Sequence, residues 1–83
     1  MELKVGSYDA TSGLRLIWDD DFAIGCILEG AQTVIKGNRA GLISLARHLL
    51  TLAGEDVPSG THLHLDSSTW LDDGSHELII ERA

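Results

Sequence analysis

The chain has little of several features on which whole classes of protein depend. Cys26 is its only cysteine, so no internal disulfide can form, and this excludes the small secreted scaffolds that disulfides hold together. The longest apolar run, residues 22–28, is far shorter than the roughly 20 residues that cross a bilayer. Residues 1–5 lack a basic region leading into an apolar run, so no export signal is expected. These absences favour a cytoplasmic protein without a membrane partner.

Basic residues are also scarce. The chain has 6 Lys and Arg residues and 13 Asp and Glu residues, which gives a net charge of −7. A field of this sign repels phosphate backbones, so no direct binding to nucleic acid is expected. Most of the excess acidity follows Gly41, and an acidic surface of this kind suits a basic protein partner.

The chain is nevertheless expected to fold. Its 83 residues are 43% hydrophobic and 23% charged, which is typical of a globular protein, and they allow only one core. We therefore expect a single domain over residues 1–83. Alternating or continuous apolar residues bounded by turn formers predict six strands, at residues 3–8, 14–18, 22–28, 31–36, 61–66 and 76–81.

One helix is predicted between the fourth and fifth strands, with Asn38 as its N-cap and Gly54 as a left-handed stop. Its core-facing stripe consists of apolar residues three or four positions apart. These are Leu42, Leu45, Ala46, Leu49, Leu52 and Ala53, and the predicted solvent side consists of Ser44, Arg47, His48 and Thr51.

The predicted fold is α+β, with element order β-β-β-β-α-β-β. It is a mixed, mostly antiparallel sheet of about six strands, with the one amphipathic helix packed on one face. A single helix cannot cover so wide a sheet, so the other face must be polar, curled on itself or covered by another molecule. Ile17, Trp18 and Ile79 are candidate apolar residues there, and a homodimer through this face is one possibility.

The pattern His62-x-His64-x-Asp66 places three side chains on one face of a strand, because side chains repeat with a period of two. Two such histidines can reach one metal ion, and His76 or a nearby carboxylate such as Glu77 would add a ligand. Any half-exposed strand alternates in the same way, and we favour that simpler interpretation. No metal or cofactor is therefore expected.

Catalytic residues are not identified. Cys26 lies within an apolar run, where a thiol behaves as a small buried hydrophobe, and no nucleophile-elbow pattern occurs among the Ser, His and Asp residues. We expect a protein that is not an enzyme. The loop after residue 66 combines Trp70 with carboxylates, which is typical either of a loop that folds its tryptophan onto the sheet or of an aromatic anchor for a basic partner.

Four stretches of the chain resemble immunity protein family 32 of bacterial polymorphic-toxin systems. They are Gly37-Asn38, the Ala- and Leu-rich helix, His62-x-His64-Leu65-Asp66, and Gly74-Ser75-x-Glu77-Leu78-Ile79-Ile80-Glu81. Residues 1–32 match only in being strand-like. The resemblance implies a small cytoplasmic protein that binds a cognate toxin, such as a basic nuclease, and protects the producing cell from it.

The predicted toxin-binding surface is the region where carboxylates, imidazoles and a tryptophan gather. It comprises His62, His64, Asp66, Trp70, Asp72, Asp73 and Glu77. Two alternatives stay open: a metal-binding protein or enzyme that uses the His62/His64/Asp66 face, with Asp72, Asp73, His76 or Glu77 as further ligands, and a homodimeric structural or regulatory module.

Overall fold

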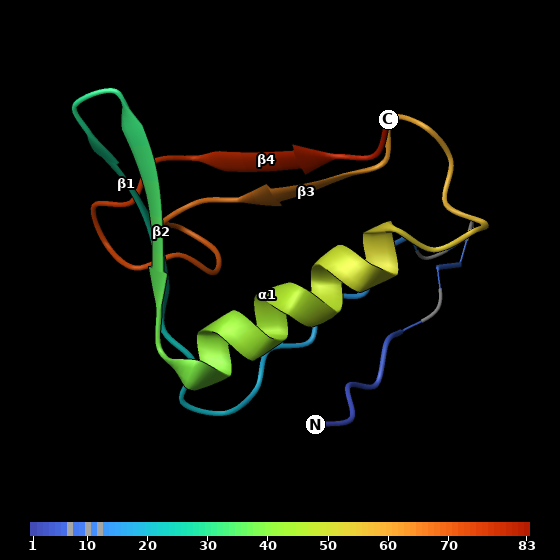
Figure 1. Cartoon of the computed structure of the whole chain (residues 1–83). Helices are drawn as coiled ribbons and strands as arrows, with labels where there is room; N and C mark the ends of the chain where they lie inside the picture. Colours follow the sequence, from blue (N-terminus) through green and yellow to red (C-terminus); the bar gives the residue numbers. More distant parts are fainter. Residues whose placement is uncertain (7, 10, 12) are drawn as a thin grey trace.

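The computed structural model describes residues 1–6, 8, 9, 11 and 13–83. Within these residues it contains one helix and four strands, in the order β1 (Ile24–Glu29), β2 (Gln32–Gly37), α1 (Arg39–Leu52), β3 (His62–Leu65) and β4 (Leu78–Glu81). β1 and β2 form one antiparallel pair, and β3 and β4 form another. In Figure 1 the β1–β2 hairpin stands upright at one end of the β3–β4 pair, and α1 runs diagonally from the base of the hairpin.

The predicted single sheet of about six strands is wrong, although the α+β class holds. The two expected N-terminal strands do not form in the described residues, where the segment contributes only an isolated bridge between Asp9 and Gly13. Ser7, within the first of these expected strands, lies outside the described residues. Alternation gives an extended segment two faces, but a strand also needs a neighbouring edge with which to exchange hydrogen bonds.

The segment just before β4 links the two separate sheets. The backbone N–H of Asp72 donates to the Ile24 carbonyl (2.8 Å), and that of His76 donates to the Cys26 carbonyl (2.7 Å). Cys26 N–H in turn donates to the Ser75 hydroxyl. Residues 72–76 thus lie along the edge of β1 that β2 leaves free, and the chain then turns away to pair with β3.

The start of α1 is fixed by Asn38, as predicted. Its side-chain oxygen accepts from the N–H of Gly41 (2.8 Å) and from the N–H of Ala23 (2.9 Å), while its amide nitrogen donates to the Asp21 carbonyl (2.8 Å). The Ala23 carbonyl approaches Gly41 so closely that a Cβ at this position would collide with it. One asparagine therefore caps the helix and also holds the entry to β1 against it.

The end of α1 differs from the prediction. Ala53 is the C-cap, with φ −80°, and Gly54 does not adopt a left-handed conformation. The Arg82 guanidinium, after β4, donates to the carbonyls of Leu52 (3.0 Å) and Gly54 (2.8 Å). A cation at the negative end of the helix dipole thus satisfies the Leu52 carbonyl at the end of α1. It also gives a second hydrogen bond to the Gly54 carbonyl, which accepts from the Val57 N–H (3.3 Å) as well.

The predicted orientation of the helix is only partly correct. Leu45 and Leu52 are buried as expected, but Leu42 and Leu49 are exposed. The polar residues expected on the solvent side are instead buried: Ser44, His48 and Thr51.

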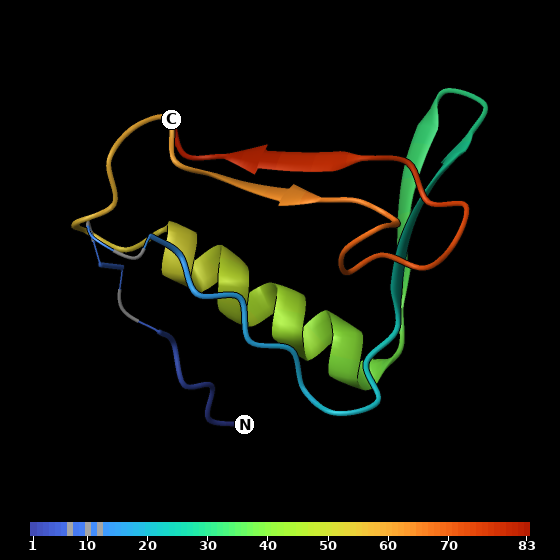
Figure 2. The same ribbon diagram turned by 180° about the vertical axis from the view of Figure 1, so that it is seen from behind.

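These polar residues are buried because the chain before β1 runs along the helix and covers them (Figure 2). Its Asp19 N–H donates to the Ser44 hydroxyl (2.9 Å), and its Asp19 carboxylate pairs with Arg47 (3.0 Å). The polar side of α1 is therefore covered by a segment that supplies hydrogen-bond partners.

The core consists of two clusters, one on each part of the helix. In both, β3 contributes its inward-facing leucines, Leu63 and Leu65, as predicted. The first cluster contains Ile24, Cys26, Leu45, Leu65 and Leu71, and the second contains Leu52, Val57 and Leu63. Cys26 is buried at the centre of the fold.

Candidate functional site

β3 places its two histidines on the side of the sheet that faces away from the core. His62 and His64 are exposed, whereas Leu63 and Leu65 between and after them are buried. His64 Nε2 lies 3.1 Å from Glu77 Oε1 and 3.9 Å from Asp66 Oδ2. The structure thus brings together three of the predicted site residues, His64, Asp66 and Glu77, which we call the His64 cluster.

Asp66 is held by its own loop. Its Oδ1 accepts hydrogen bonds from the Ser68 N–H (3.0 Å), the Ser68 hydroxyl (2.8 Å) and the Thr69 hydroxyl (3.1 Å). These bonds, the Ser68 hydroxyl first, keep the pKa of the Asp66 carboxyl below its usual value. Asp66 therefore stays anionic beside His64 and also shapes the start of the loop.

His62 lies on the same face but has different neighbours. Its Nδ1 is 3.2 Å from the Gly60 carbonyl, and in the strand register it stands opposite Glu81. With His64 it lines a shallow hollow to which Tyr8 and Leu14 also contribute. The structure therefore keeps His62 beside the His64 cluster without making it a member.

Trp70 packs on aromatic residues before β1 without being fully covered. Its ring stacks on Trp18, with centroids 5.8 Å apart, and lies 6.4 Å from the ring of Phe22. Yet 36% of the residue remains exposed. The tryptophan is thus folded onto the chain before β1, and part of its surface stays exposed to solvent.

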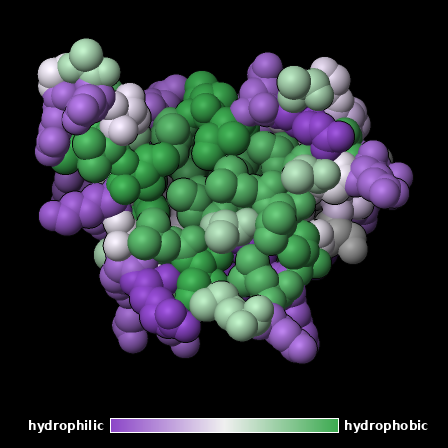
Figure 3. All heavy atoms as spheres, in the orientation of Figure 1, coloured by the Kyte–Doolittle hydropathy of each residue, from purple (hydrophilic) through white to green (hydrophobic). Residues whose placement is uncertain are grey.

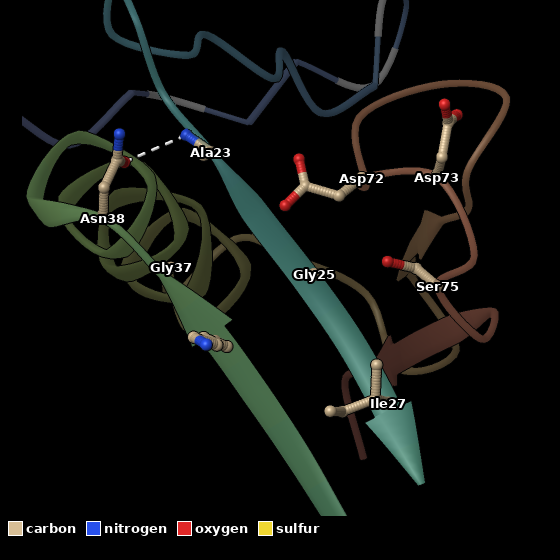
Figure 4. Close-up of a pocket in the computed structure, with 9 residues that line it drawn as sticks. Ala23, Gly25, Ile27, Gly37, Asn38, Asp72, Asp73 and Ser75 are labelled. Carbon is tan, nitrogen blue, oxygen red and sulfur yellow. Dashed lines mark hydrogen bonds between the residues drawn. The ribbon is translucent and has the colours of Figure 1, made fainter.

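Asp72 and Asp73 lie apart from the histidines, in a pocket of about 500 Å³ beside the β1–β2 hairpin. Figure 4 shows both carboxylates on the loop that passes β1, on the other side of that strand from Asn38. Lys36 contributes a positive charge to the same pocket. The predicted surface is therefore divided into the His64 cluster and a separate carboxylate pair.

Metal binding gains no support from this arrangement. Within residues 1–6, 8, 9, 11 and 13–83, no group of three or more His, Cys, Asp and Glu side chains is placed to hold a metal ion. His76, the further ligand considered above, is exposed, and its backbone N–H is engaged by β1.

Comparison of the chain with known protein families gives a match. Residues 32–83 match the family described as immunity protein 32. The chain belongs to the immunity protein 32 family. The match covers β2, α1, β3, β4 and every residue of the predicted toxin-binding surface. No curated protein and no solved structure matches the chain significantly.

The motifs that carried the resemblance now have structural explanations within this member of the immunity protein 32 family. Asn38 is the helix cap, and Gly37 is packed so tightly that a Cβ would lie 2.8 Å from the Ile24 side chain. Ser75 accepts a hydrogen bond from Cys26 and thereby holds the loop before β4 on β1. These residues build the scaffold, whereas His64 and Glu77 are exposed on its surface.

One surface was missed by the sequence analysis. The outer side of α1 is apolar, and Leu42, Leu49 and Leu50 are exposed there. Figure 3 shows hydrophobic residues across the middle of the face seen in Figure 1, with hydrophilic residues around them. The sequence does contain a sign of this, because Leu50 falls outside the predicted core stripe.

In the described part of the chain, no helix is long and apolar enough to cross a membrane.

Proposed function

We propose that this immunity protein binds a cognate bacterial toxin in the cytoplasm of the producing cell and neutralises it. The observation that carries the proposal is the family match over residues 32–83. The protein acts as an inhibitor and not as an enzyme, because the neutralising event is the formation of a protein complex. No cofactor takes part in it.

The toxin contacts the His64 cluster and the loop that follows it. Residues 66–77 join the His64 cluster to Trp70 and then to Asp72 and Asp73, so one partner lying along the loop would meet all of them. The carboxylates steer a basic partner toward this surface, and the exposed part of Trp70 supplies apolar contact area. His62 lies beside them on β3.

The toxin is basic and belongs to the nucleases. The protein carries a net charge of −7 and presents carboxylates at both ends of the loop. Enzymes that cleave nucleic acid need a positive surface to hold phosphate backbones, and an acidic inhibitor complements such a surface.

Binding is tested by calorimetric titration of the purified protein with a candidate toxin domain encoded by a gene that neighbours its own. A saturable 1:1 complex supports the proposal. If the folded protein and that folded domain form no complex at micromolar concentrations or below, the proposed function is wrong.

A further inference from the structure

The proposed toxin-binding surface does not include the outer side of α1. Leu42 and Leu50 are each 48% exposed and Leu49 is 39% exposed, which is unusual for three leucines on one short helix. Figure 3 shows hydrophobic residues across the middle of the face on which α1 lies in Figure 1. Contiguous apolar surface of this kind is typical of an interaction site.

The apolar residues on the outer side of α1 have the spacing that is typical of an interface between two packed helices. Residues 42, 46, 49 and 53 follow steps of four, three and four, so they share one side of the helix. Leucines at 42 and 49 alternate with alanines at 46 and 53. The alanines allow a second helix to approach closely, and the leucines pack on either side of them.

The distribution of charge favours a second copy of the same chain as the partner. Residues 39–52 contain no Asp or Glu, although the whole chain has 13. Two molecules that repel each other elsewhere can therefore meet here without opposing carboxylates. Arg39 is exposed at the start of the helix, and Glu55 and Asp56 are exposed just beyond its end.

We propose that two copies pair through this face, with α1 antiparallel to α1 of the second copy and Ala46 near the two-fold axis. A pairing centred on residue 46 places position 39 of one copy opposite position 53 of the other. Arg39 then lies close to Glu55 and Asp56 of the second copy, and this contact occurs twice. The outer face of β3–β4 and the loop of residues 66–77 stay free for a toxin.

The dimer does not use the uncovered sheet face considered from the sequence. On the outer side of β3–β4, Ile79 is surrounded by His62, His64, Glu77 and Glu81, so that side is largely charged or polar. A contact built around one helix of 14 residues is small for a protein interface. The dissociation constant of the dimer is accordingly expected in the micromolar range.

The test is sedimentation equilibrium of the purified protein alone, from about 1 to about 100 µM, because weak interfaces dissociate in this range. The wild type is expected to form dimers, and Leu49→Lys to raise the dissociation constant about tenfold or more, which corresponds to about 1.4 kcal/mol. Ile79→Lys is the matched control, because Ile79 is 54% exposed in β4, opposite His64 of β3 and outside the face of α1. A wild type that stays monomeric throughout overturns the proposal, as does equal weakening by both variants.

A charge reversal and a cross-link test the antiparallel arrangement independently of any effect on folding. Arg39→Glu is expected to weaken the dimer about tenfold, and combining it with Glu55→Lys and Asp56→Lys is expected to restore it. Ala46→Cys is expected to cross-link two copies on mild oxidation, whereas Ser59→Cys, in an exposed loop, is not. Failure of both the charge reversal and the cross-link contradicts the arrangement.

The same variants separate this inference from the proposed function. A monomeric wild type whose toxin binding is lost with Leu49→Lys would assign the face to the toxin and overturn the dimer. A dimer that forms without any toxin binding would leave the inference standing and remove the proposed function.

Discussion

The Trp18 indole meets the His48 imidazole edge to face, with the two ring centroids 4.8 Å apart. Trp18 also stacks on Phe22 and on Trp70, so this aromatic group connects α1, the chain before β1 and the loop that carries the proposed toxin contacts. The Nε atoms of Trp18 and His48 are buried and have no hydrogen-bond partner among the described residues. The imidazole is therefore in an environment that disfavours its charged form.

Stability is expected to fall as the pH drops below about 6.5. Burial, reinforced by Arg47 and opposed by Asp19, lowers the pKa of His48 from its ordinary value of 6.5. The unfolded chain then binds a proton that the folded chain does not, so the free energy of unfolding is reduced as the pH falls through 6.5. Urea unfolding at pH 7 and pH 5 measures this loss.

His48→Leu is expected to make that pH dependence shallower, because the group whose pKa differs between the two states is gone. His62→Gln, at an exposed position, should keep the wild-type dependence. A slope that is the same in all three proteins would show that His48 does not contribute to it.

Arg82→Met is expected to lower the free energy of unfolding by about 1–3 kcal/mol, because the carbonyls of Leu52, at the end of α1, and of Gly54, just beyond it, each lose a charge-assisted hydrogen bond. Arg15→Met is the control, since Arg15 is exposed. Urea unfolding of both variants measures the difference. Equal stabilities of the Arg82→Met and Arg15→Met variants would mean that Arg82 does not act as a helix cap.

Replacing Asp72 and Asp73 together by asparagine is expected to slow association with the toxin and leave dissociation nearly unchanged. Carboxylates at the rim of an interface act mainly on the encounter rate, and added salt should reduce the wild-type rate toward that of the variant. Surface plasmon resonance measures both rates. The control removes two carboxylates that do not line this pocket, in Glu2→Gln with Glu29→Gln, and an equal effect of the two pairs would argue against a local contact.

Trp70→Ala is expected to raise the dissociation rate of the toxin complex and to cost on the order of 2 kcal/mol of binding free energy. It should also lower Tm, because the ring packs on Trp18. Leu16→Ala, at a half-buried position of the core, controls for stability alone. If Trp70→Ala lowers Tm strongly while the folded protein still binds normally, the tryptophan belongs to the core and the proposed placement of the toxin is incorrect.

The strands and helix after residue 22 were predictable because their signals are local. Asn38 and the alternation of His62 to Leu65 each determine the conformation of a few neighbouring residues. The prediction of the two N-terminal strands was wrong because alternation of apolar and polar residues does not supply a neighbouring strand. The prediction of the buried helix face was wrong in part because hydrophobicity alone does not show that the Asp19 N–H will donate a hydrogen bond to Ser44.

The site could be predicted only in part for a similar reason. The period of a strand places His62 and His64 on one face, but the contact of His64 with Glu77 depends on the register of β3 with β4. The distance between the carboxylate pair and the histidines depends on the path of residues 72–76 along β1, which no local pattern specifies.

The most direct test of neutralisation is the survival of bacterial cells that produce a toxin domain encoded beside this protein's gene, with and without this protein. The account predicts that cells making both proteins survive and that an unrelated acidic protein of similar size does not protect them. Unchanged killing in cells that contain folded protein at levels equal to or above those of the toxin would contradict the account.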